Sequence, residues 1–175
     1  PEVIDETQPQ PHVLSQMDLA LNCLKQSKRP VFVVGHGVRL AGAQSELAQL
    51  LDTLRVPVLS SLNGCDVIPY DHPCFCGRIG TIGQRAGNFV LQNADTVIFL
   101  GTRNNIRQVG YQWVDYAKKA KKIVIDIDPA ELRKSTIVPD LAICCDVKNF
   151  VRFFAERFDG GSNAWNEWLN WGVAM

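Results

Sequence analysis

The chain has 175 residues, enough for one continuous hydrophobic core and too few for two. Apolar residues make up 46% of it and charged residues 21%, the proportions of an ordinary globular domain. Its 18 basic residues balance 18 acidic ones, so we expect no nucleic-acid partner bound through bulk charge.

Short apolar runs alternate with segments of helical period, which is the pattern of βαβ units in a parallel sheet. The runs are continuous rather than alternating, as in strands that helices cover on both faces. In chain order, we predict helix Val13–Gln26, strand Val31–Val34, helix Ala43–Leu54, strand Val56–Leu59, helix Gln84–Gln92, strand Thr96–Leu100, helix Tyr111–Lys119, strand Ile123–Ile127, strand Leu141–Cys144, helix Val147–Arg157, and a last helix with Trp165, Trp168 and Leu169 on one face.

The flanks of this pattern suggest a piece of a longer polypeptide. Residues 1–12 are rich in proline, lack an initiator Met and lack the features of a signal peptide, so we expect an interdomain linker. We expect residues 13–158 to be the domain itself. Residues 159–175 would then form a C-terminal helix that leads to a further domain. The aperiodic stretch Leu62–Gly83 is long for a compact domain, which favours a functional loop.

Ligands of open parallel sheets bind at the carboxyl ends of the strands, and glycines follow the first predicted strand. In Gly35–Gly37 they would let the backbone approach a phosphate near a helix N-terminus, although a tight turn also needs glycine. The segment is not a GxGxxG motif, because Leu40 stands at the third glycine position. Ser60 and Ser61 stand where a dinucleotide enzyme has a ribose-binding acid.

Two clusters further along the chain have the same character. Gly77, Gly80 and Gly83, at intervals of three, predict a loop pressed against a ligand or another backbone. Arg103 and Arg107 follow the strand at 96–100, where their planar guanidinium groups could clamp a phosphate or a carboxylate. The alternative is that both arginines are solvated loop residues.

Carboxylates follow the last two predicted strands. Asp126 ends a buried strand and could accept hydrogen bonds from a ribose or an adenine, and Asp146 has the same position after the last strand. Asp128 is predicted to cap a helix, with Pro129 at its first position and Glu131 completing a capping box.

The six cysteines form no CxxC pair, and no histidine lies at zinc-like spacing from one, so we predict no metal site. Cys144 and Cys145 end an apolar run and are expected to be buried. Reduced cysteines favour a cytoplasmic setting, and no apolar run reaches the roughly 20 residues of a membrane span. No nucleophile–base pair stands out, so the chain is predicted to hold a ligand rather than to transform it.

Eight short motifs occur in a characteristic order: Arg29-Pro30-Val31…Gly35-His36-Gly37, Pro57-Val58…Leu62-Asn63-Gly64, Asp71-His72-Pro73, Gly77…Gly80…Gly83, Asn93-Ala94-Asp95, Gly101-Thr102-Arg103, Asp126–Glu131 and Cys145-Asp146. In this order, from about Arg29 to Phe150, they resemble the central domain of thiamine-diphosphate enzymes of the acetolactate-synthase type. Thr81-Ile82 replaces the Met-His pair usual in that family. Asn105-Ile106 replaces the paired acids expected between the two arginines.

The resemblance implies an α/β, three-layer Rossmann-like domain of about six parallel strands in the order 3-2-1-4-5-6. In different members this domain holds FAD, ADP or nothing. The implied flavin or adenine contacts are Gly35, His36, Gly37, Ser61, Leu62, Gly80, Gly101, Thr102, Arg103, Asp126 and Asp146. Arg107 matches the arginine that recognises the substrate carboxylate in acetolactate synthases.

The resemblance also implies a parent enzyme that acts on 2-keto acids as a homodimer or tetramer. Its thiamine diphosphate and Mg²⁺ would be bound outside this chain, by flanking pyrimidine- and diphosphate-binding domains, so the chain alone is expected to be catalytically silent. Three alternatives stay open: a thiamine-diphosphate decarboxylase or lyase of other specificity, a stand-alone NAD- or nucleotide-binding module, and a structural spacer that has lost its ligand.

Overall fold

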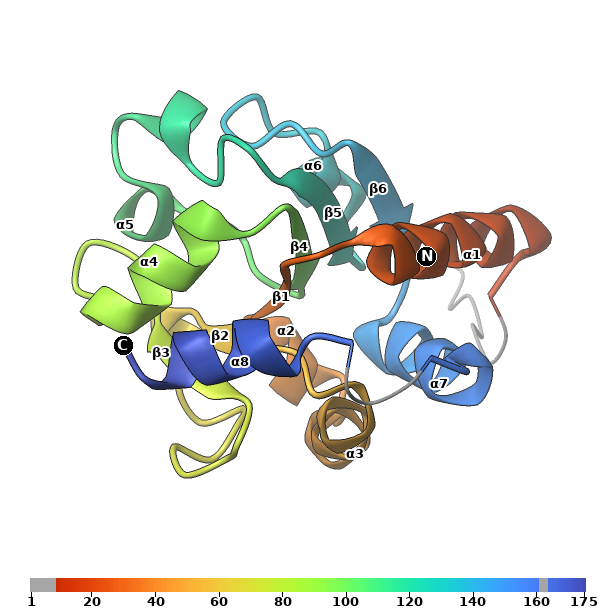
Figure 1. Cartoon of the computed structure of the whole chain (residues 1–175). Helices are drawn as coiled ribbons and strands as arrows, with labels where there is room; N and C mark the ends of the chain where they lie inside the picture. The colour runs from red at the N-terminus through yellow and green to blue at the C-terminus, as the bar shows by residue number, and fades with distance from the viewer. Residues whose placement is uncertain (1–8, 161–163) are drawn as a thin grey trace.

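The computed structural model describes residues 9–160 and 164–175, in which a six-stranded sheet is flanked by helices (Figure 1). Every strand pairing is parallel, and the strand order is β3-β2-β1-β4-β5-β6. The expected three-layer Rossmann-like α/β fold is therefore confirmed. None of the helices in the described ranges is long and apolar enough to cross a membrane.

The strands that form the centre of the sheet are those that the apolar runs predicted. β1 and β4 are buried along their whole length, which explains why their sequences do not alternate. The sheet consists of β1 (Pro30–Val34), β2 (Val58–Ser60), β3 (Phe75–Arg78), β4 (Thr96–Leu100), β5 (Lys121–Asp126) and β6 (Leu141–Cys144).

One strand falls where the residue pattern predicted none. β3 lies inside the aperiodic stretch Leu62–Gly83 and pairs with β2 at the edge of the sheet. It has only four residues, including Gly77 and the exposed Arg78, so it produces no apolar run. The family resemblance, with its six strands, did imply it.

The described helices are α1 (Pro11–Gln26), α2 (His36–Leu40), α3 (Gln44–Leu54), α4 (Arg85–Asn93), α5 (Ile106–Val109), α6 (Pro129–Leu132), α7 (Val147–Arg157) and α8 (Asn166–Val173), with 3₁₀ turns at Leu62–Gly64 and Trp113–Asp115. α7 matches its prediction residue for residue. α1 begins at Pro11, inside the stretch expected to be a linker, of which residues 1–8 lie outside the described part. Helices α1, α3 and α7 pack together, while α4 packs on α8.

The helix predicted over Tyr111–Lys119 was wrong, because only a single 3₁₀ turn forms there. Tyr111 and Val114 are exposed, and the buried Tyr116 and Ala117 follow the 3₁₀ turn rather than lying on an α-helix. Ala117 has a φ of +48°, a left-handed conformation that an α-helix of L-residues cannot contain.

α8 attaches the C-terminal part of the chain to the start of the central strand. Trp165, Trp168 and Leu169 are buried on one face, as predicted. The Trp165 indole donates a hydrogen bond to the carbonyl of Ser27 at 2.8 Å, and the Trp168 indole donates to the carbonyl of Pro30 at 2.8 Å. Buried indole N–H groups require such partners, and these two fix the helix over the amino end of β1.

At the other end of the sheet, the β1–α2 turn and the loop after β4 approach each other backbone to backbone. The Gly35 amide donates to the carbonyl of Leu100, and the Gly37 amide donates to that of Gly101, both at 2.9 Å. A Cβ at Gly35 would lie 2.3 Å from the Gly101 oxygen, and one at Gly37 would lie 2.7 Å from the Gly101 Cα. This contact supports the tight-turn interpretation of the two glycines.

We expect Gly35→Ala to destabilise the domain by about 3 kcal/mol, because the new methyl group meets an immobile backbone. Gly35 has a φ of −118°, so its cost would be purely steric. Gly42 is the matched control: it has a φ of +59° and open space around its Cβ, so Gly42→Ala should cost about 1 kcal/mol through the backbone alone. Urea unfolding of both variants compares the two costs, and equal values would contradict the steric argument.

Candidate functional site

A cavity of about 720 Å³ opens at the carboxyl edge of the sheet, between segments that follow all six strands. Most of the residues expected to bind a ligand line it. These residues are His36, Gly37, Ser61, Leu62, Gly101, Thr102, Arg103, Arg107, Asp126 and Asp146. The topology thus brings together residues that are up to 110 positions apart, counting from 36 to 146.

Gly35 and Gly80 are the two expected site residues that do not line the cavity. Gly35 faces the Gly101 backbone, as described above. Gly80 has a φ of +108°, and a Cβ there would lie 2.9 Å from the carbonyl oxygen of Arg107. Both glycines therefore allow the backbones of the loops around the cavity to approach each other closely, without lining the cavity themselves.

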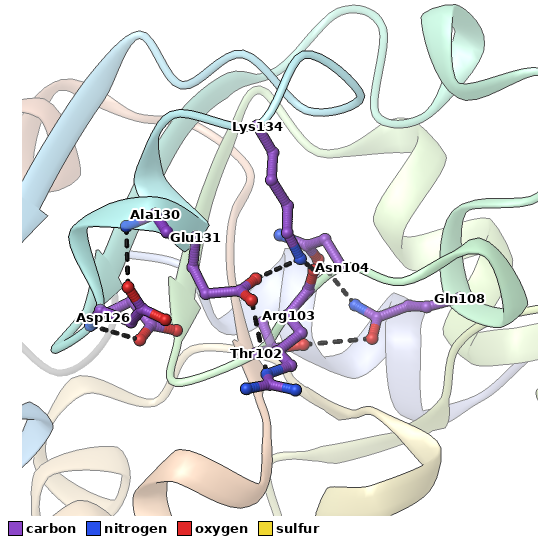
Figure 2. Close-up of polar contacts among 9 residues, drawn as sticks. Thr102, Arg103, Asn104, Gln108, Asp126, Ala130, Glu131 and Lys134 are labelled. Atoms are coloured by element: carbon purple, nitrogen blue, oxygen red, sulfur yellow. Dashed lines mark hydrogen bonds and ion pairs between the residues drawn. The ribbon is translucent and has the colours of Figure 1, made fainter.

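One side of the cavity is acidic. Asp126, the last residue of β5, accepts a hydrogen bond from the Asp128 amide at 3.0 Å, and Asp128 caps α6 by accepting from the Ala130 amide at 2.8 Å (Figure 2). Asp146 caps α7 by accepting from the Lys148 amide at 2.6 Å. The predicted cap at Asp128 is confirmed.

The capping box predicted for Glu131 was wrong. In such a box the Glu131 side chain would accept from the Asp128 amide, but Asp126 already occupies that amide. Glu131 turns instead toward the loop after β4, where its Oε1 lies 3.4 Å from the Arg103 Nε and its other oxygen pairs with Lys134 (Figure 2). Lys134 also donates to the Arg103 carbonyl at 3.1 Å.

Burial raises the pKa of Asp126 above its ordinary value, and the charges of Glu131 and Asp128 add to that effect. Hydrogen bonds from the backbone amides of Asp128 and Ile127 partly oppose it. The side chain remains at the surface of the cavity, with the residue 9% exposed. A ligand hydroxyl or amino group that donates to this carboxylate would therefore favour its ionised form.

The loop after β4 contributes two arginines to the cavity, and their side chains remain accessible. The Arg103 side chain is 74% exposed despite its contact with Glu131, and Arg107 is exposed at the cavity rim. Exposed apolar side chains surround the rim: Leu40, Leu62, Ile82, Ile106 and Ile127. The arrangement suits a ligand with an anionic group, a hydrogen-bond donor and an apolar face.

Sequence reasoning missed the residues that support this rim. Glu131 on α6 and Lys134, two residues past the end of that helix, are three positions apart and form an ion pair that the capping interpretation obscured. Gln108, Asn104 and Tyr116 form a buried hydrogen-bond network below the arginine loop. Their positions follow no period, so only the folded chain reveals them.

The remaining titratable clusters have structural partners. His72 lies away from the cavity, where its Nδ1 accepts from the Cys74 amide at 3.1 Å. Burial raises the pKa of Cys74 to about 11 and that of Cys76 to about 12, which keeps both thiols protonated. Cys144, expected to be buried, is exposed because it faces outward on the edge strand β6. Within the described residues, no group of three or more His, Cys, Asp and Glu could hold a metal ion.

Residues 17–154 match the sequence model of a family described as "Thiamine pyrophosphate enzyme, central domain". The chain belongs to this family. The match covers nearly all of the sheet and its helices, and it ends within α7.

Full-length relatives agree with this assignment. A probable acetolactate synthase large subunit from Methanocaldococcus jannaschii is 37% identical over 137 residues, which cover 78% of this chain and 23% of the relative. The acetolactate synthase large subunit of Cyanidium caldarium is 32% identical over 150 residues, covering 86% and 25%. Acetolactate synthase 1 of Zea mays is 30% identical over 169 residues, covering 93% and 26%. The chain thus spans about a quarter of the length of these relatives.

We expect Asp126→Asn to become more stable than the wild type as the pH rises. The raised pKa means that the folded wild type holds this proton more tightly than the unfolded chain, so its stability falls as pH rises from 3.8 through the folded value. Asparagine can keep the hydrogen bond from Asp128 without the buried charge. Urea unfolding from pH 3.5 to 7 measures the difference, with Asp18→Asn on the exposed face of α1 as the matched control. A difference that shrinks with rising pH would contradict the argument.

Proposed function

We propose that this chain is the non-catalytic central domain of a thiamine-diphosphate-dependent enzyme that acts on 2-keto acids. Acetolactate-synthase-like carboligation or decarboxylation is the reaction that the relatives' names support best. In the parent, flanking pyrimidine- and diphosphate-binding domains would bind thiamine diphosphate and Mg²⁺, and the whole would assemble as a homodimer or tetramer. We also propose a reducing, cytoplasmic setting, in which buried thiols such as Cys74 and Cys76 stay reduced.

Within that parent, we propose that this domain binds an adenine nucleotide, either FAD or ADP. The observation that carries the proposal is one cavity whose lining includes both carboxylates and arginines. Asp126 and Asp146 would accept hydrogen bonds from ribose or adenine, and Arg103 would meet the diphosphate. The volume of about 720 Å³ lies within the usual range for such ligands.

The residues present fit an adenine nucleotide with some limits. The Gly37 amide donates to the Gly101 carbonyl and is therefore not free for a phosphate, which leaves the anion to the arginines. Arg103 can release Glu131 to a ligand, because Lys134 remains to neutralise that carboxylate. The adenine nucleotide would have a structural role here, and a flavin would bring redox chemistry that the proposal does not require.

The alternative of a stand-alone NAD module has less support. In that class an acidic residue after the second strand binds a ribose, but this chain has the buried Ser60 and Ser61 there. A decarboxylase or lyase of other specificity remains compatible with the family. For any of these parents, we propose that Arg107 at the rim faces the substrate carboxylate.

Calorimetry with FAD, ADP and NAD tests the ligand. We expect heat with FAD or ADP, and a loss of about tenfold in affinity for Arg103→Gln, because a charged hydrogen bond is removed. Asp146→Asn should also weaken binding while it keeps the cap of α7, since asparagine caps helices well. Arg133→Gln, on an exposed residue outside the cavity, is the matched control. Preference for NAD would favour the stand-alone module, and no heat with any ligand would favour the spacer.

The chain alone should not turn over substrate. The thiamine-binding groups are proposed to lie in other domains, and among the described residues that line the cavity no hydrogen bond joins a hydroxyl to a histidine or a carboxylate. Incubation with thiamine diphosphate, Mg²⁺ and pyruvate, followed by detection of CO₂ and acetolactate, checks this expectation. Measurable turnover above a heat-denatured control would refute the non-catalytic assignment.

A further inference from the structure

The segment of residues 101–110, which includes α5, carries both arginines of the cavity and also a buried glutamine, Gln108. The Gln108 Oε1 accepts a hydrogen bond from the Thr102 hydroxyl at 3.1 Å. The Gln108 Nε2 donates to the Asn104 Oδ1 at 2.8 Å, and Figure 2 shows the contacts with Thr102 and Asn104. The same Nε2 donates to the Tyr116 hydroxyl at 3.2 Å. Its carbonyl and both of its amide hydrogens thus have partners, although the residue is only 8% exposed.

The partners of Gln108 lie on both sides of Arg103 in the sequence. Thr102 precedes Arg103 and Asn104 follows it, and both are buried while the arginine between them is exposed. Asn104 has a φ of +45°, a left-handed conformation that turns the chain at this point. Gln108 therefore holds the two residues that decide where the Arg103 backbone points.

The network is anchored to the sheet through an aromatic contact. The Tyr116 ring stacks on Phe99 of β4 with their centroids 6.0 Å apart. Burial raises the pKa of Tyr116, so its hydroxyl stays protonated. Because a buried polar group without partners is costly, the network has one favourable arrangement rather than several.

Arg107, the residue before Gln108, is fixed at its backbone by two other contacts. Its amide donates to the Asn105 side chain at 3.0 Å. Its carbonyl accepts from both the amide and the hydroxyl of Thr81, each at 3.0 Å. Gly80 makes this approach feasible, since a side chain there would collide with the Arg107 oxygen.

We infer that Gln108 is a positioning residue that presents both arginines to an anionic ligand, with Thr81 as a second support for Arg107. The arginines have exposed, flexible side chains, so a fixed backbone lowers the entropy lost when they bind a phosphate or a carboxylate. This inference rests on the proposed function, because it requires an anionic ligand in the cavity.

ADP affinity, measured by calorimetry on the whole chain, tests the inference. Gln108→Met has nearly the same length and none of the hydrogen bonds, and we expect it to weaken ADP binding about tenfold. If Gln108 acts through the arginines, this loss should largely disappear in an Arg103→Gln, Arg107→Gln background. An equal loss in both backgrounds would mean a general structural role and would overturn the inference. Gln92→Met, on the exposed face of α4, is the matched control.

Amide hydrogen exchange at residues 103 and 107 supplies a readout that needs no ligand. We expect Gln108→Met to accelerate exchange there at least tenfold, and the milder Tyr116→Phe and Thr81→Val variants to have smaller effects. If the wild type binds no ADP, the proposal of an adenine nucleotide is wrong. The exchange rates alone then test whether Gln108 positions the backbone of the two arginines. Unchanged rates at both positions would overturn the positioning role, whatever the affinity for ADP.

Discussion

The cavity depends on the contact between two backbones, that of the β1–α2 turn and that of the loop after β4. Gly35 and Gly37 approach Gly101 so closely that no side chain fits between them. β1 and β4 are also the strands between which the order of the sheet reverses, the position where open α/β sheets bind ligands. At that position the glycine backbones contact each other. The ligand-binding groups must therefore come from neighbouring residues such as His36 and Thr102.

The order of the strands determines where the charged residues lie around the cavity. The loop after β4 carries Arg103 and Arg107, while the ends of β5 and β6 contribute carboxylates. Glu131 pairs with both Arg103 and Lys134, so the acidic and basic parts of the lining are in contact. Opposite charges on adjoining walls favour a ligand that is itself divided into an anionic part and a hydrogen-bond-donating part.

The sequence predicted most of the fold because buried parallel strands are continuous apolar runs, as in β1 and β4. It failed in two places: β3 is a four-residue edge strand, and the segment after Tyr111 buries Tyr116 and Ala117 without forming an α-helix. The candidate site was predictable to the extent that strand ends meet at one edge. The orientation of Glu131 and the contacts of Gln108 could not be predicted. Each depends on which of several nearby polar groups forms the hydrogen bond in the folded chain.

The attachment of α8 also determines what an optical experiment on this protein would observe. Three of the four tryptophans lie at this helix, with Trp168 stacked on Trp171 at 5.0 Å and two indoles bonded to carbonyls beside the start of β1. Only Trp113 belongs to the segment that follows the arginine loop. Intrinsic fluorescence would therefore report mainly on the amino edge of the sheet. Ligand binding at the carboxyl edge would change it only through Trp113, so loosening of α8 and occupancy of the cavity are spectroscopically separable events.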